Sequence, residues 1–233
     1  MMQAYQQALQ TPGALRFSIA GLLGRLPASM TGLGIVLLVE HQTESYGIAG
    51  LVAALYILTS AIAAPIQGRL ADQFGQRPIL FTVSAFYAAG VAVMVSAAGD
   101  GLLLTSLGAV IAGIGAPQTG NMVRTRWTHA VSDRKLLSTA FAWEAILDEV
   151  VFIIGPVLVT FLTLNVSAPL GLTAAAISSI VGGWGLALQR STAPLPVVSQ
   201  NRSSDPLPMA PLVSLIFAAL GIGFVFGASE VLI

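Results

Sequence analysis

The sequence contains no cysteine and only two histidines, His41 and His129, among its 233 residues. A disulfide framework is therefore excluded, and no cluster of side chains suits zinc, iron or copper. Charged residues make up only 9% of the chain, whereas soluble domains carry about a quarter. The formal net charge is zero and the arginines are scattered, so we expect no surface that binds nucleic acid. We also expect no metal and no cofactor.

Apolar side chains take the place of charge and make up 55% of the residues. Seven apolar runs are each long enough to cross a hydrocarbon core of ~30 Å as a helix. This pattern predicts an all-α polytopic membrane protein whose first partner is the lipid bilayer. The predicted helices span residues 15–39, 47–67, 78–98, 102–123, 136–164, 170–188 and 212–233.

The basic residues predict how these helices are oriented. Nine of the ten lie near the start of the first helix or in every second loop, and the intervening turns hold none. Because lysine and arginine mark cytoplasmic loops, we expect a multi-pass protein of the cell (plasma) membrane with a cytoplasmic amino terminus. The tail at 1–14 and the proline-rich linker at 189–211 are then cytoplasmic. The nine residues are Arg16, Arg69, Arg77, Arg124, Arg126, Arg134, Lys135, Arg190 and Arg202.

A charged island at residues 68–78 separates the second and third predicted helices. It resembles the loop pattern G-x-x-x-D-[RK]-x-G-[RK]-[RK] of the major facilitator superfamily of secondary transporters, which lies between the same two helices. The matching residues are Gly68, Asp72, Gly75 and Arg77. Gln73 and Gln76 stand where the family has cations. The resemblance implies that this stretch is a conformational-switch loop.

The resemblance also implies a fold and a function for the rest of the chain. Residues 15–188 would form the family's amino-terminal six-helix half, 189–211 its central loop, and 212–233 the first helix of its second half. The chain is then truncated relative to twelve helices, and a carboxy-terminal half is a missing partner. The implied activity is secondary active transport, with proton-linked efflux of an unidentified small organic molecule, as by an antiporter, as its expected form.

Two other interpretations are alternatives to transport. The chain could be a non-transporting, membrane-embedded partner, or an inactive remnant that keeps the half-transporter fold. Enzyme activity is not expected, because the helices contain neither a G-x-S-G nor a paired G-x-G-D arrangement of an intramembrane protease. A retinal-type receptor is excluded because Lys135, the only lysine, lies in a predicted loop.

Four charged residues lie deep within predicted helices, where inserting a charge costs ~2.5–3.5 kcal/mol. Arg25 is in the first helix, and Glu144, Asp148 and Glu149 are in the fifth. Glu144 and Asp148 share a helical face, while Glu149 is turned about 100° from Asp148. Three acids facing one arginine would leave negative charge for a proton or ligand to neutralise. We therefore take all four as transport and proton-coupling candidates; the alternative is an internal ion pair with no transport role.

Gly155 and Pro156 in the fifth predicted helix resemble the centre of the family's antiporter pattern, g-x-x-x-G-P-x-x-G-G, although Val151 and Val159 replace two of its glycines. A Gly-Pro pair inside a helix predicts a kink. In the fourth helix, Ala109 stands where drug/proton antiporters of the family carry an arginine. This departure weakens a standard drug/proton antiport mechanism.

Further polar residues lie near the inner end of the fourth predicted helix. Gln118, Thr119 and Asn121 either line a cavity or bond a carbonyl freed by the neighbouring proline, and we favour the second role. Trp127 and His129 are expected at the cytoplasmic interface of the membrane, where an indole is comfortable.

Overall fold

The computed structural model describes residues 2–97 and 101–196, together with 213–214, 217–218 and 221. Over these residues every regular element is a helix, which confirms the predicted all-α class. The elements are α1 (Met2–Leu9), α2 (Ala14–Thr43), α3 (Tyr46–Phe74), α4 (Gln76–Ser96), α5 (Leu102–Gly115), α6 (Thr119–Ala130), α7 (Arg134–Asn165), α8 (Leu170–Leu188) and the 3₁₀ turn η1 (Arg190–Thr192). The predicted seventh helix at 212–233 and the linker beyond residue 196 lie largely outside the described residues.

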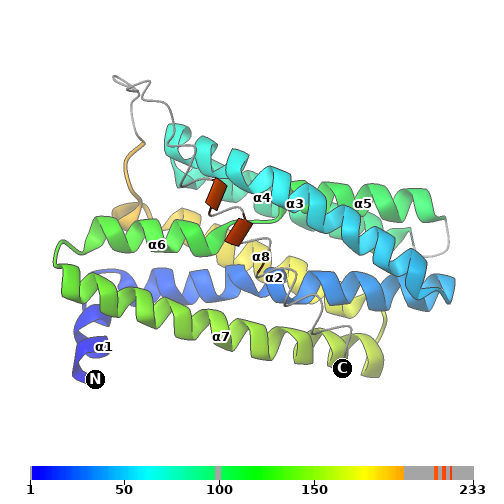
Figure 1. Cartoon of the computed structure of the whole chain (residues 1–233), viewed down its shortest axis with the longest axis horizontal. Helices are drawn as coiled ribbons and strands as arrows, with labels where there is room; N and C mark the ends of the chain where they lie inside the picture. Colours follow the sequence, from blue (N-terminus) through cyan, green and yellow to red (C-terminus); the bar gives the residue numbers. More distant parts are fainter. Residues whose placement is uncertain (1, 98–100, 197–212, 215–216, 219–220, 222–233) are drawn as a thin grey trace. The chain divides into compact units, whose positions relative to one another are not determined.

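Among the described residues, six stretches are long and apolar enough to cross a membrane: α2, α3, α4, α5 together with α6, α7 and α8. Each of them overlaps one of the first six predicted helices. α7 has 32 residues and is therefore ~48 Å long at 1.5 Å per residue, which exceeds the hydrocarbon core. α2 packs along α7 and also against α8, α3 and α6, so it contacts much of the bundle (Figure 1).

The connection between α3 and α4 is shorter than the sequence predicts. Only Gly75 interrupts the two helices. Its φ of 85° is a backbone conformation that residues with a side chain rarely adopt. The rest of the island at 68–78 is helical, because its arginine, leucine, alanine and glutamine residues are good helix formers. The charged island is therefore a tight hairpin of two long helices around one glycine.

The fourth membrane crossing is a broken helix. α5 and α6 are separated at Pro117, because a proline pushes the preceding residue out of the helical conformation. Ala116 accordingly has φ −58° and ψ 107°. The Gln67 side chain of α3 bonds the carbonyls at the break: its Nε2 donates to the oxygens of Ile114 at 2.8 Å and of Ala116 at 3.1 Å.

This break corrects two sequence predictions. The expected helix at 102–123, followed by a polar loop at 124–135, is wrong, because α6 carries most of that polar stretch through to Ala130. Trp127, predicted at the cytoplasmic interface of the membrane, is fully buried among the helices. The polar side chains of α6 are satisfied by neighbouring helices, and a sequence pattern does not reveal such partners.

Two close helix crossings hold the bundle together. A Cβ atom on Gly182 of α8 would lie 2.1 Å from the backbone nitrogen of Gly24 on α2. Where α4 crosses α5, a Cβ on Gly90 would lie 2.2 Å from the backbone nitrogen of Ala112. No side chain fits at such distances, so glycine brings the backbones into contact, as in other membrane helix pairs. The first crossing also fixes the position of Arg25, the neighbour of Gly24.

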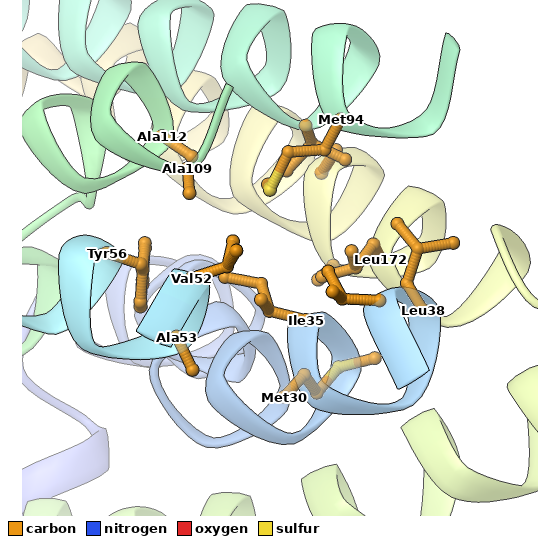
Figure 2. Close-up of a cluster of buried hydrophobic side chains, with 14 of the residues drawn as sticks. Met30, Ile35, Leu38, Val52, Ala53, Tyr56, Met94, Ala109, Ala112 and Leu172 are labelled. Atoms are coloured by element: carbon orange, nitrogen blue, oxygen red, sulfur yellow. The ribbon is translucent and has the colours of Figure 1, made fainter. Parts of the chain in front are cut away.

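One apolar cluster lies further along α2 than Arg25, and a second cluster, which includes Phe17 and Trp127, lies on the amino-terminal side of Arg25. Figure 2 shows Ile35 and Leu38 of α2 close to Leu172 of α8, with Val52 of α3 beside them. Helices α4 and α5 close the cluster with residues that include Met94. This apolar cluster therefore lies between Arg25 and the carboxyl end of α2.

Candidate functional site

Arg25 joins α2 to both carboxylates on one face of α7. Its Nη2 contacts Glu144 Oε2, and the two side chains are 6% and 0% exposed. Its Nη1 lies 3.0 Å from Asp148 Oδ1. One guanidinium therefore bridges the acids that the sequence places four residues apart, in the geometry of a charge-assisted pair.

The second carboxylate oxygen of Glu144 is also bonded. Ser18 Oγ of α2 donates to Oε1 at 2.9 Å, and Trp127 Nε1 of α6 donates to the same atom at 2.7 Å. A buried charge is tolerated only when it is paired and hydrogen-bonded. Glu144 meets both conditions through groups from α2 and α6.

Asp148 has a second arginine partner that the sequence does not predict. Arg124 Nη2 of α6 lies 2.5 Å from Asp148 Oδ2. The side chains of Asp148 and Arg124 are 29% and 40% exposed, so this pair lies at the open side of the cluster. We call Arg25, Glu144, Asp148 and Arg124 the charge network.

The charge network corrects the expected charge balance. It holds two acids and two arginines, whereas the sequence suggests three acids facing one arginine. Glu149 lies on the exposed face of α7 and makes no ion pair within the part of the chain that the structure describes. The reason is its position next to Asp148, which rotates it about 100° away from Arg25.

Gly155 brings α7 close enough to α2 for these contacts. A Cβ on Gly155 would lie 1.9 Å from Ser29 Oγ, so only glycine fits here without a shift. Ser29 Oγ also donates to the Val151 carbonyl at 3.0 Å. α7 runs through Pro156 as one continuous helix. Gly155 therefore acts first as a contact point between α2 and α7, one turn of α2 away from Arg25.

The residues that resemble the switch loop lie around the α3–α4 hairpin. Asp72 is exposed and, with Gly68 and the α6 residue Asn121, lines a cavity of about 140 Å³. Arg77 lies over the Phe81 ring, 5.8 Å from its centroid. The fourth matching residue, Gly75, makes the turn itself.

Gln76 departs from the family pattern for a structural reason. It is buried, and its Oε1 accepts a hydrogen bond of 2.8 Å from Arg126 Nε while its Nε2 donates to the Met122 carbonyl at 3.0 Å. Arg126 is fully buried and also donates to the carbonyl oxygens of Leu186 and Gln189 and to Thr192 Oγ1. A cation at position 76 would face the Arg126 guanidinium, so the glutamine avoids a buried repulsion.

The polar residues at the break bond backbone carbonyls or line a small cavity. Thr119 Oγ1 donates to the Gly24 carbonyl at 2.8 Å and thereby ties α6 to α2. Gln118 Nε2 donates to the Ala116 carbonyl at 3.5 Å. Gln118 and Asn121 also line the small cavity beside Asp72.

Sequence reasoning missed three members of the site: Ser18, Arg124 and Trp127. Arg124 and Trp127 are three residues apart, so they share a face once the stretch is known to be helical. This spacing was the only sequence signal for the two residues. It was obscured because the high density of basic residues in 124–135 is typical of a loop. Ser18 carries no signal, since a lone serine near a helix start is common.

Comparison with protein families identifies the family of the chain. The model of the family described as Major Facilitator Superfamily matches residues 17–233, which is most of the chain. Members of this family are membrane transporters, and the six apolar helices fit a multi-pass membrane protein of this kind. The chain belongs to the major facilitator superfamily.

Proposed function

We propose that the chain forms the amino-terminal half of a secondary active transporter that couples proton movement to the efflux of a small organic molecule. The observation that carries this proposal is the charge network, in which Asp148 is held by Arg25 and Arg124 within a bundle of membrane-crossing helices. Ionisable groups at such positions are costly and mark ion or substrate pathways. Asp148 is the coupling carboxylate in this proposal, because its partial exposure gives protons access.

The broken fourth crossing supports the same role. Discontinuous membrane helices form the substrate and ion sites of many transporters, because irregular backbone is tolerated where it lines a cavity. Here the break precedes α6, which supplies Arg124 and Trp127 to the site. A helix segment that is separate from α5 can move the Arg124 side chain without unfolding the crossing.

The setting of the site is also part of the proposal. We place the protein in the cell membrane with its amino terminus in the cytoplasm, on the basis of the positive-inside pattern. A carboxy-terminal half would cover the exposed faces of α3 and α7. In the most apolar stretch of each of these helices only 28% and 22% of the residues are buried, compared with 50% in α2 and α8. Such a half would enclose a cavity beside the partly exposed Asp148.

The competing interpretation is a non-transporting membrane protein in which the charge network only stabilises the contacts between helices. The equal number of acids and arginines favours it, because a balanced network needs no proton or ligand for neutrality. The two functions differ in what the loss of the Asp148 charge does. A structural network loses stability, whereas a coupling site also loses proton-linked flux.

The test is a proton-flux assay on everted membrane vesicles that contain the full chain. Vesicles are acidified by respiration, the pH gradient is followed by acridine fluorescence, and a panel that includes ethidium, tetraphenylphosphonium and organic anions is added. We expect at least one compound to release protons from wild-type vesicles and Asp148→Asn to lower that response about 10-fold or more, as loss of a proton-transfer group does.

Glu44→Gln is the matched control, because it removes an exposed carboxylate at the α2–α3 turn. Its response should equal that of the wild type, with equal amounts of protein in the vesicles. Identical traces for wild type, Asp148→Asn and empty vesicles across the panel would contradict the proposal and favour the structural role.

A further inference from the structure

Arg126 is a buried cation whose hydrogen-bond partners are all neutral. Its side chain is fully buried. It donates to Gln76 Oε1, to Thr192 Oγ1 and to the carbonyl oxygens of Leu186 and Gln189. None of the ion pairs among the described residues includes it. Removing a charge from water is costly unless an opposite charge is near. The acceptors therefore satisfy the N–H groups of Arg126 but leave its positive charge uncompensated.

A cavity lies directly behind this guanidinium. It has a volume of about 660 Å³ and is lined by residues at the start of α2 and the end of α8, among them Gln189 and Thr192. Arg126 Nη1 lies 2.9 Å from the Gln189 carbonyl oxygen and 2.9 Å from Thr192 Oγ1. Thr192 is 8% exposed, and its hydroxyl accepts from Arg126 but donates to no group in the part of the chain that the structure describes. The cavity wall thus combines a buried cation with an unused hydroxyl donor.

Two exposed arginines line the same cavity, Arg16 of α2 and Arg190 of η1. The Gln189 side chain holds their backbones together, because its Nε2 donates to the Arg16 carbonyl at 3.2 Å and to the Gly185 carbonyl at 3.0 Å. Neither arginine side chain makes an ion pair with a described residue, and the described residues that line the cavity include no Asp or Glu. Three arginines therefore make this cavity strongly electropositive.

Exposed leucines lie beside these cations. Leu15 of α2 and Leu188 of α8 line the cavity and are 53% and 64% exposed. Both helices are long and apolar enough to cross a membrane. Figure 1 shows the start of α2, next to α1, at the end of the bundle where α6 leads into α7. Basic pockets at the ends of membrane helices bind the headgroups of anionic lipids, whose acyl chains need an apolar surface close by. A soluble anion would make no use of the leucines.

We propose that this cavity binds the phosphate of an anionic phospholipid such as phosphatidylglycerol. Arg16 and Arg190 donate to the phosphate oxygens from the open side, Thr192 donates from the wall, and the charge of Arg126 lies behind it. The acyl chains lie along the two exposed leucines. A zwitterionic lipid binds less well, because its own cation faces the arginines. The inference is independent of the transport function, since no residue that lines the cavity belongs to the charge network.

Native mass spectrometry of the full chain, purified and delipidated in detergent, tests this proposal. The probe is dioleoyl phosphatidylglycerol, and the fraction of the chain that retains one lipid is measured as the lipid concentration is raised. Phosphatidylcholine with the same acyl chains is the comparison, and it should bind more weakly to the wild type. In the double variant Arg16→Gln/Arg190→Gln, the concentration of phosphatidylglycerol for half-maximal binding should rise about 10-fold or more, because two cations near the headgroup are lost.

Two further double variants make the result specific. Arg134→Gln/Lys135→Gln removes the same charge from exposed residues that do not line the cavity, and it should bind phosphatidylglycerol as the wild type does. Arg16→Lys/Arg190→Lys keeps the charge and should bind more tightly than the glutamine variant. Without lipid, the glutamine variant should melt at the temperature of the wild type, because the two arginine side chains have no partner among the described residues. Lost binding is then not lost folding.

Inorganic phosphate separates a lipid headgroup from a free anion. Added to the lipid-free wild type, it should leave the melting temperature nearly unchanged, whereas phosphatidylglycerol should raise it. An equal rise with inorganic phosphate would overturn the lipid assignment and make a soluble phosphate the ligand. The site itself is overturned if the wild type binds phosphatidylcholine as tightly as phosphatidylglycerol, or if the Arg134→Gln/Lys135→Gln variant loses as much binding as the Arg16→Gln/Arg190→Gln variant.

Discussion

Replacing Arg25 with methionine is expected to destabilise the protein by about 3–5 kcal/mol, because the fully buried Glu144 would lose its counter-ion. Ser18 and Trp127 would still donate to Glu144, but neither of them carries charge. Asp148 would keep Arg124. The measurement is thermal unfolding in detergent, followed by loss of the monodisperse peak in size-exclusion chromatography.

The controls for this prediction separate charge from packing. Arg16→Met changes an exposed arginine on the same helix and should shift the melting temperature little. Arg25→Met combined with Glu144→Gln should recover part of the lost stability, because no unpaired buried charge is left. If the double variant is less stable than Arg25→Met alone, the two residues do not stabilise each other as the geometry indicates.

Gly182→Ala is expected to be the most disruptive small substitution in α8. The added Cβ would lie 2.1 Å from the Gly24 nitrogen and 2.7 Å from the Ala20 oxygen, and both are backbone atoms that cannot rotate away. Overpacking of this kind typically costs about 1–3 kcal/mol. The shift of α2 would also displace Arg25. Gly182→Ala should therefore lower proton-linked flux, as Asp148→Asn does. Melting temperature and flux are measured on the same preparations.

Gly185→Ala on the same helix is the matched control. Its Cβ would meet only the Ala20 Cβ, at 3.7 Å, which is ordinary van der Waals contact. Alanine also favours helix over glycine by about 1 kcal/mol. This variant should be as stable as the wild type or more so. Equal melting temperatures for Gly182→Ala and Gly185→Ala would show that α2 and α8 do not cross where the structure places them.

The sequence predicts the helices well because their lengths and apolar content are local properties. The six described crossings, the hairpin around Gly75 and the shared face of Glu144 and Asp148 all follow from spacing and composition. The family follows from the same hairpin, and it is confirmed by the match over residues 17–233.

The sequence does not predict how side chains meet between helices. The stretch that carries Arg124 and Trp127 is polar enough to resemble a loop, and it is helical because α4, α7 and α8 provide partners for its side chains. Which face of α7 meets Arg25 depends on how α7 packs on α2, where Gly155 contacts Ser29. These contacts are tertiary, so no local pattern contains them.

The central claim is the proposed role of Asp148 as the coupling carboxylate of the charge network. Infrared difference spectroscopy of the full chain in lipid, recorded while the pH is changed, tests it most directly through the carbonyl stretch of a protonated carboxylic acid. We expect a band that appears on acidification, disappears in Asp148→Asn and persists in Glu144→Gln. A band that persists in Asp148→Asn and disappears in Glu144→Gln would contradict it.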